Sequence, residues 1–318
     1  MAASKGCSNL HRFLNSVTPI VPSRTLFLAC EHDEMNLHGK LSNDKEGDVG
    51  YFKLKDLWNC YEEWSAFGVE TRVALKSGET VKQYYIPYLS AVQIYVASSK
   101  SPSMLSSNRS EADVDSESLS DDSRSSELSR SLSKVSSNTW DSASEDSSHD
   151  QGGSWSCRDR FGDIYLEYFE TCSMNLRVPF TNKMDELLKN HPELNSLTSL
   201  DVSPASWMAV SWYPIYHIPN INDKDLSACF LTYHTLSSIF LDLYALLIVE
   251  DDRDELSDEI WLSPYGIAAY KMRGDLWIKS GTAEYAKFVN LQKAATSWLK
   301  QLNVYHHDSS FFASRLTV

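Results

Sequence analysis

The sequence predicts a single α+β domain, with a mixed or mainly antiparallel sheet covered by helices, interrupted by a disordered insertion. Three observations predict it. Of the 318 residues, 42% are hydrophobic, which is enough for a substantial core. Strand-like and helix-like segments do not alternate as in βαβ folds, which favours an antiparallel sheet with helices on one face. A polar segment with few aromatic residues divides the chain.

This polar segment is rich in serine. Residues 98–150 contain 22 serines, 11 acidic and 5 basic residues, and Trp140 is their one aromatic residue. Such a composition buries too little apolar surface to offset the entropy lost on ordering. The sequence therefore predicts a disordered insertion over 98–158.

The part before the insertion is too small to fold alone. It offers a short helix around Phe13, a helix over 54–68 and a strand over 82–97. We therefore expect 8–97 and 159–305 to form two parts of one domain. The flanking segments are predicted as a flexible N-terminus, 1–7, and a C-terminal tail, 306–318.

Each element of the first part has its own signal. Leu54, Leu57, Trp58, Tyr61 and Trp64 recur at helical spacing, and Gly68 is placed to end that helix. The segment 82–97 is rich in aromatic and β-branched residues, and the proline within it, at position 87, indicates an edge or a bulge.

The second part reads as several strands and a closing helix. Thr282 is placed to cap the closing helix, whose apolar stripe runs from Phe288 to Leu302. The segment 236–249 fits either a helix or a strand. The remaining predictions are a strand over 163–170, a helix over 182–190, sheet segments over 206–218 and 228–235, and a hairpin of 261–270 with 276–279 turning at 273–275.

Charge argues against nucleic-acid partners. The chain has 29 basic and 43 acidic side chains, a formal net charge of −14, which repels a phosphate backbone. No membrane partner is expected either. The apolar segment 226–249 is interrupted by His234 and Asp242, and its uninterrupted part is shorter than a span of roughly 20 residues.

The spacing of the cysteines indicates in which cellular compartment the protein is expected. The six cysteines lie far apart with no CxxC pair, so neither a zinc ribbon nor a disulfide framework is predicted. We expect an intracellular protein of the cytoplasm or nucleus. Pro19 and Pro22 would break the amphipathic helix of an organelle transit peptide.

The common catalytic motifs are missing, and we predict no cofactor and no metal site. No GxGxxG, Walker loop, HExxH, GxSxG or kinase signature occurs. The acidic run 250–259 lacks the spacing of a calcium loop, and adjacent side chains such as those of 306–308 rarely converge on one ion.

One aromatic cluster is the candidate pocket. Rings that pack in a core explain it more simply, but a ligand groove with histidine as acid or base is the alternative. Its residues are Trp207, Trp212, Tyr213, His217 and His234.

The insertion carries candidate phosphorylation sites. Four of its serines have an acidic residue three positions later, the pattern preferred by acidophilic kinases, and each phosphate would add roughly −1.5 to −2 charges. Chance matches in an acidic serine-rich segment are the alternative. The candidate serines are Ser110, Ser118, Ser142 and Ser147.

Several stretches together resemble a plant protein family known as a domain of unknown function, number 789. The matching pieces include YFKLKDLWNCYEEWSAFG (51–68), VKQYYIPYLSAVQIY (81–95), SLDVSPASWMAVSWYPIYHIPN (199–220) and YGIAAYKMRGDLW (265–277). The resemblance covers both sides of the insertion and implies one domain across it. It implies no reaction, cofactor or catalytic residue. His217 stands where the family often has arginine, which implies a weakened or pH-dependent form of any anion site there.

Two functions remain open from the sequence. The first is a non-enzymatic interaction or regulatory protein, whose serine-rich segment adjusts the binding of a protein partner. The second is an enzyme or small-molecule-binding protein with its pocket near Trp207–His217.

Overall fold

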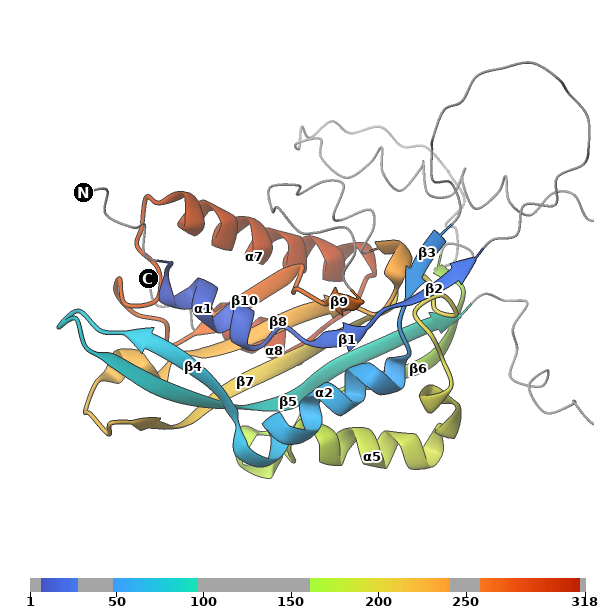
Figure 1. The fold of residues 1–318 in the computed structure, drawn as a ribbon, viewed down its shortest axis with the longest axis horizontal. Coiled ribbons are helices and arrows are strands. Elements are labelled where there is room, and N and C mark those ends of the chain that lie inside the picture. Colours follow the sequence, from blue (N-terminus) through green and yellow to red (C-terminus); the bar gives the residue numbers. More distant parts are fainter. Residues whose placement is uncertain (1–6, 28–47, 97–160, 241–257, 315–318) are drawn as a thin grey trace, which may run out of the picture. The chain divides into compact units, whose positions relative to one another are not determined.

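Strand β5 (Thr80–Val96) is the longest strand and the centre of the main sheet (Figure 1). Along one edge it pairs first with β4 (Val69–Ala74) and then with β6 (Asp163–Phe169), and along its other edge it pairs with β7 (Trp207–Ile218). Beyond β7 lie β8 (Cys229–Thr235) and β10 (Gly266–Tyr270). Every pair is antiparallel, which confirms an α+β fold with an antiparallel sheet.

The computed structural model describes residues 7–27, 48–96, 161–240 and 258–314. The described residues on the two sides of the insertion belong to one compact unit. Strand pairing joins the two parts directly, because β5 lies before the insertion whereas its partners β6 and β7 lie after it. The insertion itself, with its predicted disorder, and most of 236–249 fall outside the described residues.

Smaller elements complete the described chain. Two short antiparallel pairs stand apart from the main sheet: β1 (Ile20–Pro22) with β9 (Glu259–Trp261), and β2 (Arg24–Phe27) with β3 (Asp48–Tyr51). The helices are α1 (Asn9–Ser16), α2 (Leu54–Phe67), α5 (Phe180–Asn190), α7 (Ala283–Gln301) and α8 (His307–Ser314), with 3₁₀ turns η2 (Met174–Leu176), η3 (Pro192–Asn195) and η4 (Lys224–Ser227).

The predicted helix ends are confirmed at two positions. The hydroxyl of Thr282 accepts a hydrogen bond from the amide of Tyr285 at 3.2 Å, which satisfies one free donor of the first turn of α7. Gly68 ends α2 with a φ of 80°, and its amide donates to the carbonyl of Trp64. A side chain at position 68 would be strained at that φ.

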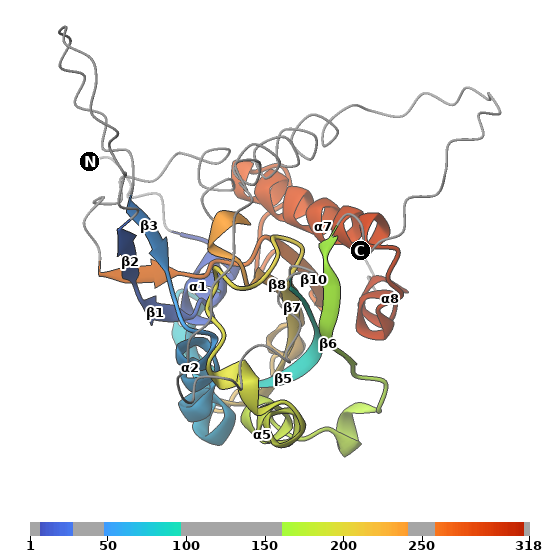
Figure 2. The same cartoon turned by 90° about the vertical axis from the view of Figure 1, so that its right-hand side faces the viewer.

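Helices cover both faces of the sheet, so the expectation of helices on one face is wrong. Side chains alternate along β7. Met208 and Trp212 pack with α1, α2 and α5, whereas Trp207 and Ala209 pack with α7 and α8. Figure 2 shows α1 and α2 on one side of the curled sheet and α7 and α8 on the other. Continuous burial of the last eight residues of β5 and the first six residues of β7 is typical of a sheet covered on both faces.

Pro87 lies in the middle of the sheet, at a local edge. Along the edge of β5 that β4 and β6 share, β4 pairs no further than Tyr85 and β6 begins at Ala91. The missing N–H of Pro87 therefore costs no ladder hydrogen bond on that edge. Register shifts in the pairing with β7 flank it, between Tyr84 and Tyr85 and between Leu89 and Ala91.

The predicted hairpin of 261–270 with 276–279 is wrong. The residues 261–270 fall partly in two separate strands, β9 and β10, and 276–279 is not a strand. The carbonyls of Leu276 and Trp277 instead accept hydrogen bonds from Asn9 Nδ2 and the Leu10 amide, at 2.7 and 3.0 Å. The start of α1 thus takes the place of a strand partner.

The predicted C-terminal tail contains a packed helix. Helix α8 begins at His307, and its Asp308 and Phe312 are buried. Phe312 packs in the core under β8 and β10, which explains why the segment does not behave as a tail. Within the described residues, no helix has both the length and the apolar character that crossing a membrane requires.

Candidate functional site

A bulge in β5 positions Ser90 for a network of buried polar side chains. Leu89 pairs with Val210 and Ala91 pairs with Ala209, so Ser90 is the extra residue between them. Its carbonyl accepts a hydrogen bond from the Glu170 amide at 2.9 Å, and its side chain is fully buried. Bulges of this kind redirect a side chain and are frequent near functional sites.

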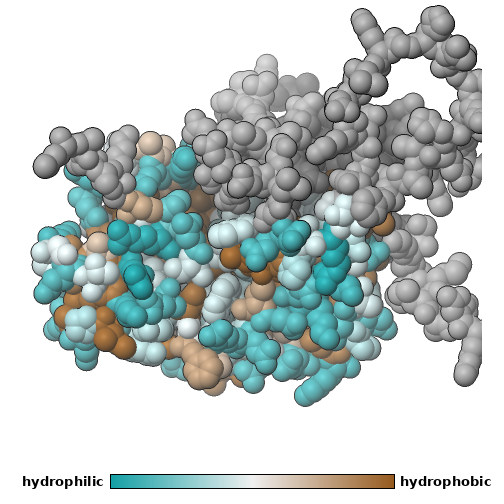
Figure 3. All heavy atoms as spheres, in the orientation of Figure 1, coloured by the Kyte–Doolittle hydropathy of each residue, from teal (hydrophilic) through white to brown (hydrophobic). Residues whose placement is uncertain are grey.

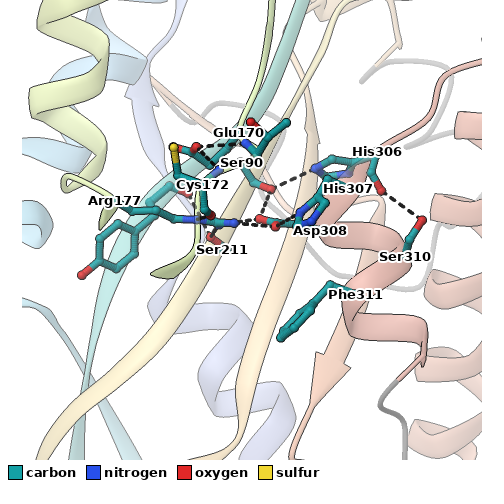
Figure 4. A network of polar contacts seen from close by, with 12 residues as sticks. Ser90, Glu170, Cys172, Arg177, Ser211, His306, His307, Asp308, Ser310 and Phe311 are labelled. Carbon is teal, nitrogen blue, oxygen red and sulfur yellow. Dashed lines mark hydrogen bonds and ion pairs between the residues drawn. The ribbon is translucent and has the colours of Figure 1, made fainter. Parts of the chain in front are cut away.

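Helix α8 brings two further polar groups to Ser90. His306 immediately precedes the helix and Asp308 lies in its first turn. Ser90 Oγ lies 2.9 Å from Nε2 of His306 and 2.6 Å from Oδ2 of Asp308 (Figure 4). The other ring nitrogen of His306, Nδ1, lies 3.1 Å from the hydroxyl of Tyr233 in β8.

Arg177, which follows η2, completes the network. Its Nη1 and Nη2 donate to the two oxygens of Asp308 at 2.6 and 2.7 Å, a bidentate ion pair with side-chain exposures of only 4% and 1%. Its Nε donates to the carbonyl of Cys172 at 3.0 Å. The Glu170 carboxylate in turn accepts from the Cys172 amide at 2.8 Å, so the loop before η2 is fixed to the same network.

The hydrogen bonds of the network form one consistent pattern. Asp308 accepts from Arg177 and from the hydroxyl of Ser90. Since the only proton of Ser90 Oγ goes to Asp308, His306 Nε2 must donate to Ser90, and in a neutral imidazole Nδ1 then accepts from Tyr233. This assignment uses every close contact of the imidazole. The contacts are therefore those of a neutral imidazole protonated at Nε2.

The pKa values support that assignment. Burial lowers the pKa of His306 to about 4, which outweighs the attraction of Asp308 for the charged form. Burial would raise the pKa of Asp308, but hydrogen bonds from Arg177 and Ser90 and the charge of Arg177 lower it below its ordinary value. At neutral pH Asp308 is a carboxylate, Arg177 carries its positive charge and the imidazole of His306 is uncharged.

Serine, histidine and aspartate are the residue types of a hydrolytic triad, but their arrangement differs from one. In a triad the carboxylate binds the histidine, and the histidine accepts the proton of the serine. Here the carboxylate binds Ser90 directly, and His306 has donor rather than acceptor contact with it. Ser90 is also sealed from solvent. The arrangement ties α8 and the 170–177 loop to the sheet and does not activate a nucleophile.

The five residues of the predicted pocket do not converge. Trp207 and Tyr213 lie on the face of the sheet under α7 and α8, whereas Trp212 lies on the opposite face. His234 is fully buried on the Trp212 face, where its ring contacts the Leu262 carbonyl and the Thr232 hydroxyl, each at 2.9 Å. Burial lowers its pKa to about 4.

His217 lies apart from the other four, near the end of β7. Its Nε2 is 2.7 Å from the carbonyl oxygen of Ile221 and 3.0 Å from the Ile221 amide, so it closes the loop that follows. Trp207 and Trp212 donate to Gln93 and Thr232, as buried indoles require. Core packing, the simpler interpretation of the cluster, accounts for these contacts.

The candidate phosphorylation sites lie outside the described residues. Ser110, Ser118, Ser142 and Ser147 all fall within 97–160.

The sequence interpretation missed the network itself. His306 and Asp308 stood out as a polar pair after a helix, but their target, Ser90, is more than 200 positions away. Arg177 and Tyr233 carried no motif. The one available signal was the closely spaced His306 and Asp308 in a segment rich in aromatic residues.

Comparison with known proteins identifies the chain at family level only. No curated protein and no solved structure matches it. One family model, described as a protein of unknown function (DUF789), matches residues 8–312, which includes every element of the main sheet and the whole polar network. The chain therefore belongs to the DUF789 family of proteins of unknown function.

Proposed function

We propose that the protein is a non-catalytic interaction module. Its ordered domain docks a basic protein partner through an apolar surface at the end of β7, and the serine-rich segment 98–158 adjusts that binding through its charge. The single observation that carries the proposal is a group of large apolar side chains left in solvent at one end of the sheet.

We call this group the β7-end patch and define it as Phe67, Ile215, Tyr216 and Ile218. Their exposed fractions are 71%, 46%, 47% and 53%. Figure 3 shows hydrophobic surface at the end of the sheet where β4 and β7 finish and at the C-terminus of α2. Contiguous exposed apolar surface of this kind marks interaction sites in soluble domains.

The patch lies where two elements meet. Gly68 directly follows Phe67, and a Cβ built at Gly68 would lie 3.3 Å from Cδ1 of Ile215. The ring of Tyr216 stacks on Tyr84 with centroids 4.5 Å apart. Ile218 lies two positions beyond Tyr216 on the same strand, and so on the same face of the sheet. The end of α2 and the end of β7 thus lie next to each other.

Buried polar groups support a binding role over a catalytic one. Four described side chains of the types that act in hydrolysis, Ser90, His306, Asp308 and His234, are sealed in the core and bonded to one another or to neighbouring groups. A catalytic group must reach its substrate. The apolar patch, by contrast, is open to solvent.

Charge complementarity selects the partner. The net charge of −14 favours a basic surface. An acidophilic kinase would be a second partner, which phosphorylates the insertion. Phosphates on its four candidate serines would add roughly −6 to −8 charges in total. These serines are Ser110, Ser118, Ser142 and Ser147. Phosphorylation would therefore change the affinity for a basic partner, through long-range attraction that salt weakens.

Affinity recovery with matched variants tests the proposal. The bait is the full chain, as wild type, Ile218→Asp or Tyr305→Asp. Tyr305 is 75% exposed between α7 and α8 and does not belong to the patch, so it serves as the control. We expect wild type and Tyr305→Asp to recover a protein that Ile218→Asp does not recover. The purified partner should then bind directly to wild type and Tyr305→Asp with similar affinity, and more weakly to Ile218→Asp. Equal recovery by all three baits would refute the proposal.

The regulatory part has its own experiment. Replacing 98–158 by a short Gly/Ser linker, or treating the bait with phosphatase, should change recovery of the patch-dependent partner while the thermal unfolding curve stays cooperative. Regulation by the serine-rich segment would be rejected if recovery is unchanged in both arms. It would also be rejected if mass spectrometry of the native protein finds no phosphate on the four serines. Neither result would bear on the docking surface, which the bait variants test.

A further inference from the structure

A polar pocket lies between α1 and the strands β4 and β5, near the turn that joins these strands. Its volume is about 700 Å³, within the range of roughly 300–1,000 Å³ that is typical of sites for small molecules. The side-chain amide of Asn9 bonds to the carbonyl and to the amide of Ala74, each at 2.8 Å, which fixes α1 beside β4 (Figure 1). The lining residues are Arg12, Asn15 and Ser16 of α1, Glu70 and Arg72 of β4, and Thr80 of β5.

Glu70 is the one acidic residue among these six, and its charge is already offset by cations. Its Oε1 accepts a hydrogen bond from Arg72 Nε at 3.3 Å. Its Oε2 accepts from Lys82 Nζ at 3.0 Å and from the hydroxyl of Tyr84 at 3.1 Å. The hydrogen bond from Lys82 contributes most to holding the pKa of Glu70 below its ordinary value. Glu70 therefore holds the two cations Arg72 and Lys82 close together.

Most hydrogen-bond donors of these cations are unused. Arg72 donates to Glu70 through Nε alone, so neither of its Nη groups bonds to a described residue, and its side chain is 71% exposed. The guanidinium of Arg12 has no hydrogen bond or ion pair among the described residues. Counted over Arg12, Arg72, Lys82 and Glu70, three positive charges and one negative charge give a local charge of +2. The whole chain has a formal net charge of −14, so the pocket is locally of the opposite sign.

The other lining groups are polar and uncharged. The hydroxyl of Ser16 donates to the Arg12 carbonyl at 2.8 Å, so its oxygen is left to accept. Asn15 contacts His11 through Nδ2, which leaves its side-chain oxygen as an acceptor. No apolar or aromatic residue is among the lining residues of this described pocket, so a nucleotide base or a lipid chain would find no side chain to pack on.

We infer that this pocket binds the phosphate monoester of a polyol, with the phosphate at Arg72 and the hydroxyl groups against α1. A guanidinium presents paired N–H donors that match two oxygens of a phosphate. A phosphate monoester carries roughly −1.5 to −2 charges at neutral pH, which complements the local positive charge. The oxygens of Asn15 and Ser16 accept hydrogen bonds from hydroxyl groups, which a sugar or a similar polyol supplies.

Titration of the full-length protein, followed by the amide chemical shifts of α1, β4 and the start of β5, tests the ligand class. The probes are glucose 6-phosphate, glucose and inorganic phosphate, all at constant ionic strength. We expect saturable shifts with glucose 6-phosphate at millimolar concentrations and no binding of glucose. Inorganic phosphate should bind about fivefold more weakly, because it lacks the hydroxyl contacts. Equal affinity for the two phosphates, or no saturable shift with glucose 6-phosphate up to about 20 mM, would overturn the inference.

Matched variants locate the site. Arg72→Gln and Arg12→Gln each remove one charge from a wall of the pocket, and each should weaken the binding of glucose 6-phosphate about tenfold. Lys76→Gln removes the same charge from the exposed turn between β4 and β5, outside the lining, and should change the affinity by no more than about twofold. Equal weakening by all three variants would indicate general attraction by charge and would contradict a defined pocket.

The same chemical group occurs on soluble metabolites and as the headgroup of a lipid, and sedimentation with vesicles separates the two sources. The vesicles consist of phosphatidylcholine with or without phosphatidylinositol 4-phosphate. Sedimentation that requires the phosphoinositide and that Arg72→Gln abolishes identifies a lipid headgroup. Binding of glucose 6-phosphate without sedimentation identifies a soluble metabolite. No protein partner takes part in these experiments, so their outcome is independent of the docking role proposed for the β7-end patch.

Discussion

Asp308 and Arg177, 131 positions apart in the chain, form a bidentate ion pair that is almost completely buried, with N–O distances of 2.6 and 2.7 Å. The pair joins α8, the last described helix, to the loop before α5. Burying two charges is costly unless each is paired and hydrogen-bonded, and here both conditions hold.

Removing one partner of this pair should destabilise the fold strongly. Arg177→Met leaves the Asp308 carboxylate buried without its counter-ion, and we expect a loss of about 3–5 kcal/mol in the free energy of unfolding. Urea denaturation measures it. The pair of Arg24 and Asp56, also 2.6 Å apart but only partly buried, is the control. Arg24→Met should cost at most about 1 kcal/mol.

The combined variant Arg177→Met/Asp308→Leu distinguishes pairing from packing. It should recover a large part of the loss of Arg177→Met, because no unpaired charge remains in the core. A double variant as unstable as the sum of its two single variants would show that the ion pair itself does not account for the effect.

The two buried histidines should make stability depend on pH in a defined window. The pKa values of His234 and His306 are lowered from 6.5 to about 4 in the folded protein. The unfolded chain therefore binds more protons between these values, and stability falls as pH decreases from about 6.5 to about 4, by about 3 kcal/mol per histidine. The pKa of Asp308 is lowered from 3.8, so its contribution is lost only at more acidic pH.

Replacing one histidine should remove about half of that dependence. We expect the free energy of unfolding of His306→Gln, measured between pH 7 and pH 4.5, to fall with about half the slope of the wild type. The exposed His11 provides the control variant, His11→Gln. Parallel curves for wild type and His306→Gln would contradict a neutral buried imidazole.

Ser90 should not react as a nucleophile. Its hydroxyl proton goes to Asp308 and its side chain is sealed, so a fluorophosphonate probe should leave Ser90 unmodified in the folded protein. Peptide mass spectrometry after labelling checks this. A stoichiometric adduct at Ser90 that His306→Gln abolishes would contradict the assignment and support a serine enzyme.

Close packing between β10 and α7 gives a prediction independent of charge. A Cβ at Gly266 would lie 2.8 Å from Cβ of Ala295. We expect Gly266→Ala to cost about 1–3 kcal/mol through displacement of α7, as overpacking does. Thermal or urea unfolding measures the loss. The double variant Gly266→Ala/Ala295→Gly restores the space and should be more stable than Gly266→Ala alone, whereas equal stability would argue against this contact.

The parts of the fold that local patterns encode could be predicted. The apolar spacing of Leu54 to Trp64 and the glycine that follows specify α2, and Thr282 specifies the start of α7. The composition of 82–97 identified the central strand. The hairpin prediction failed because the partner of Leu276 and Trp277 is α1, more than 260 residues earlier, and no local pattern reports such a contact.

The buried polar network and the β7-end patch could not be predicted either, because both depend on contacts between residues far apart in the sequence. Trp207 and Trp212 are close in sequence and aromatic, yet the alternation of a strand places them on opposite faces of the sheet. Ser90, Arg177 and His306 meet only through the bulge in β5, the loop after β6 and the packing of α8. The β7-end patch becomes visible only when exposure is known, since Ile215 and Ile218 look like core residues in the sequence.

Site-specific photo-crosslinking tests docking through the β7-end patch most directly. A photoreactive phenylalanine replaces Tyr216 in the full chain, and in a second protein it replaces Tyr305. The account predicts a crosslinked basic partner from position 216, absent from position 305, that excess wild-type protein suppresses and excess Ile218→Asp protein does not. The same crosslinks from both positions, or equal suppression by both competitors, would contradict it.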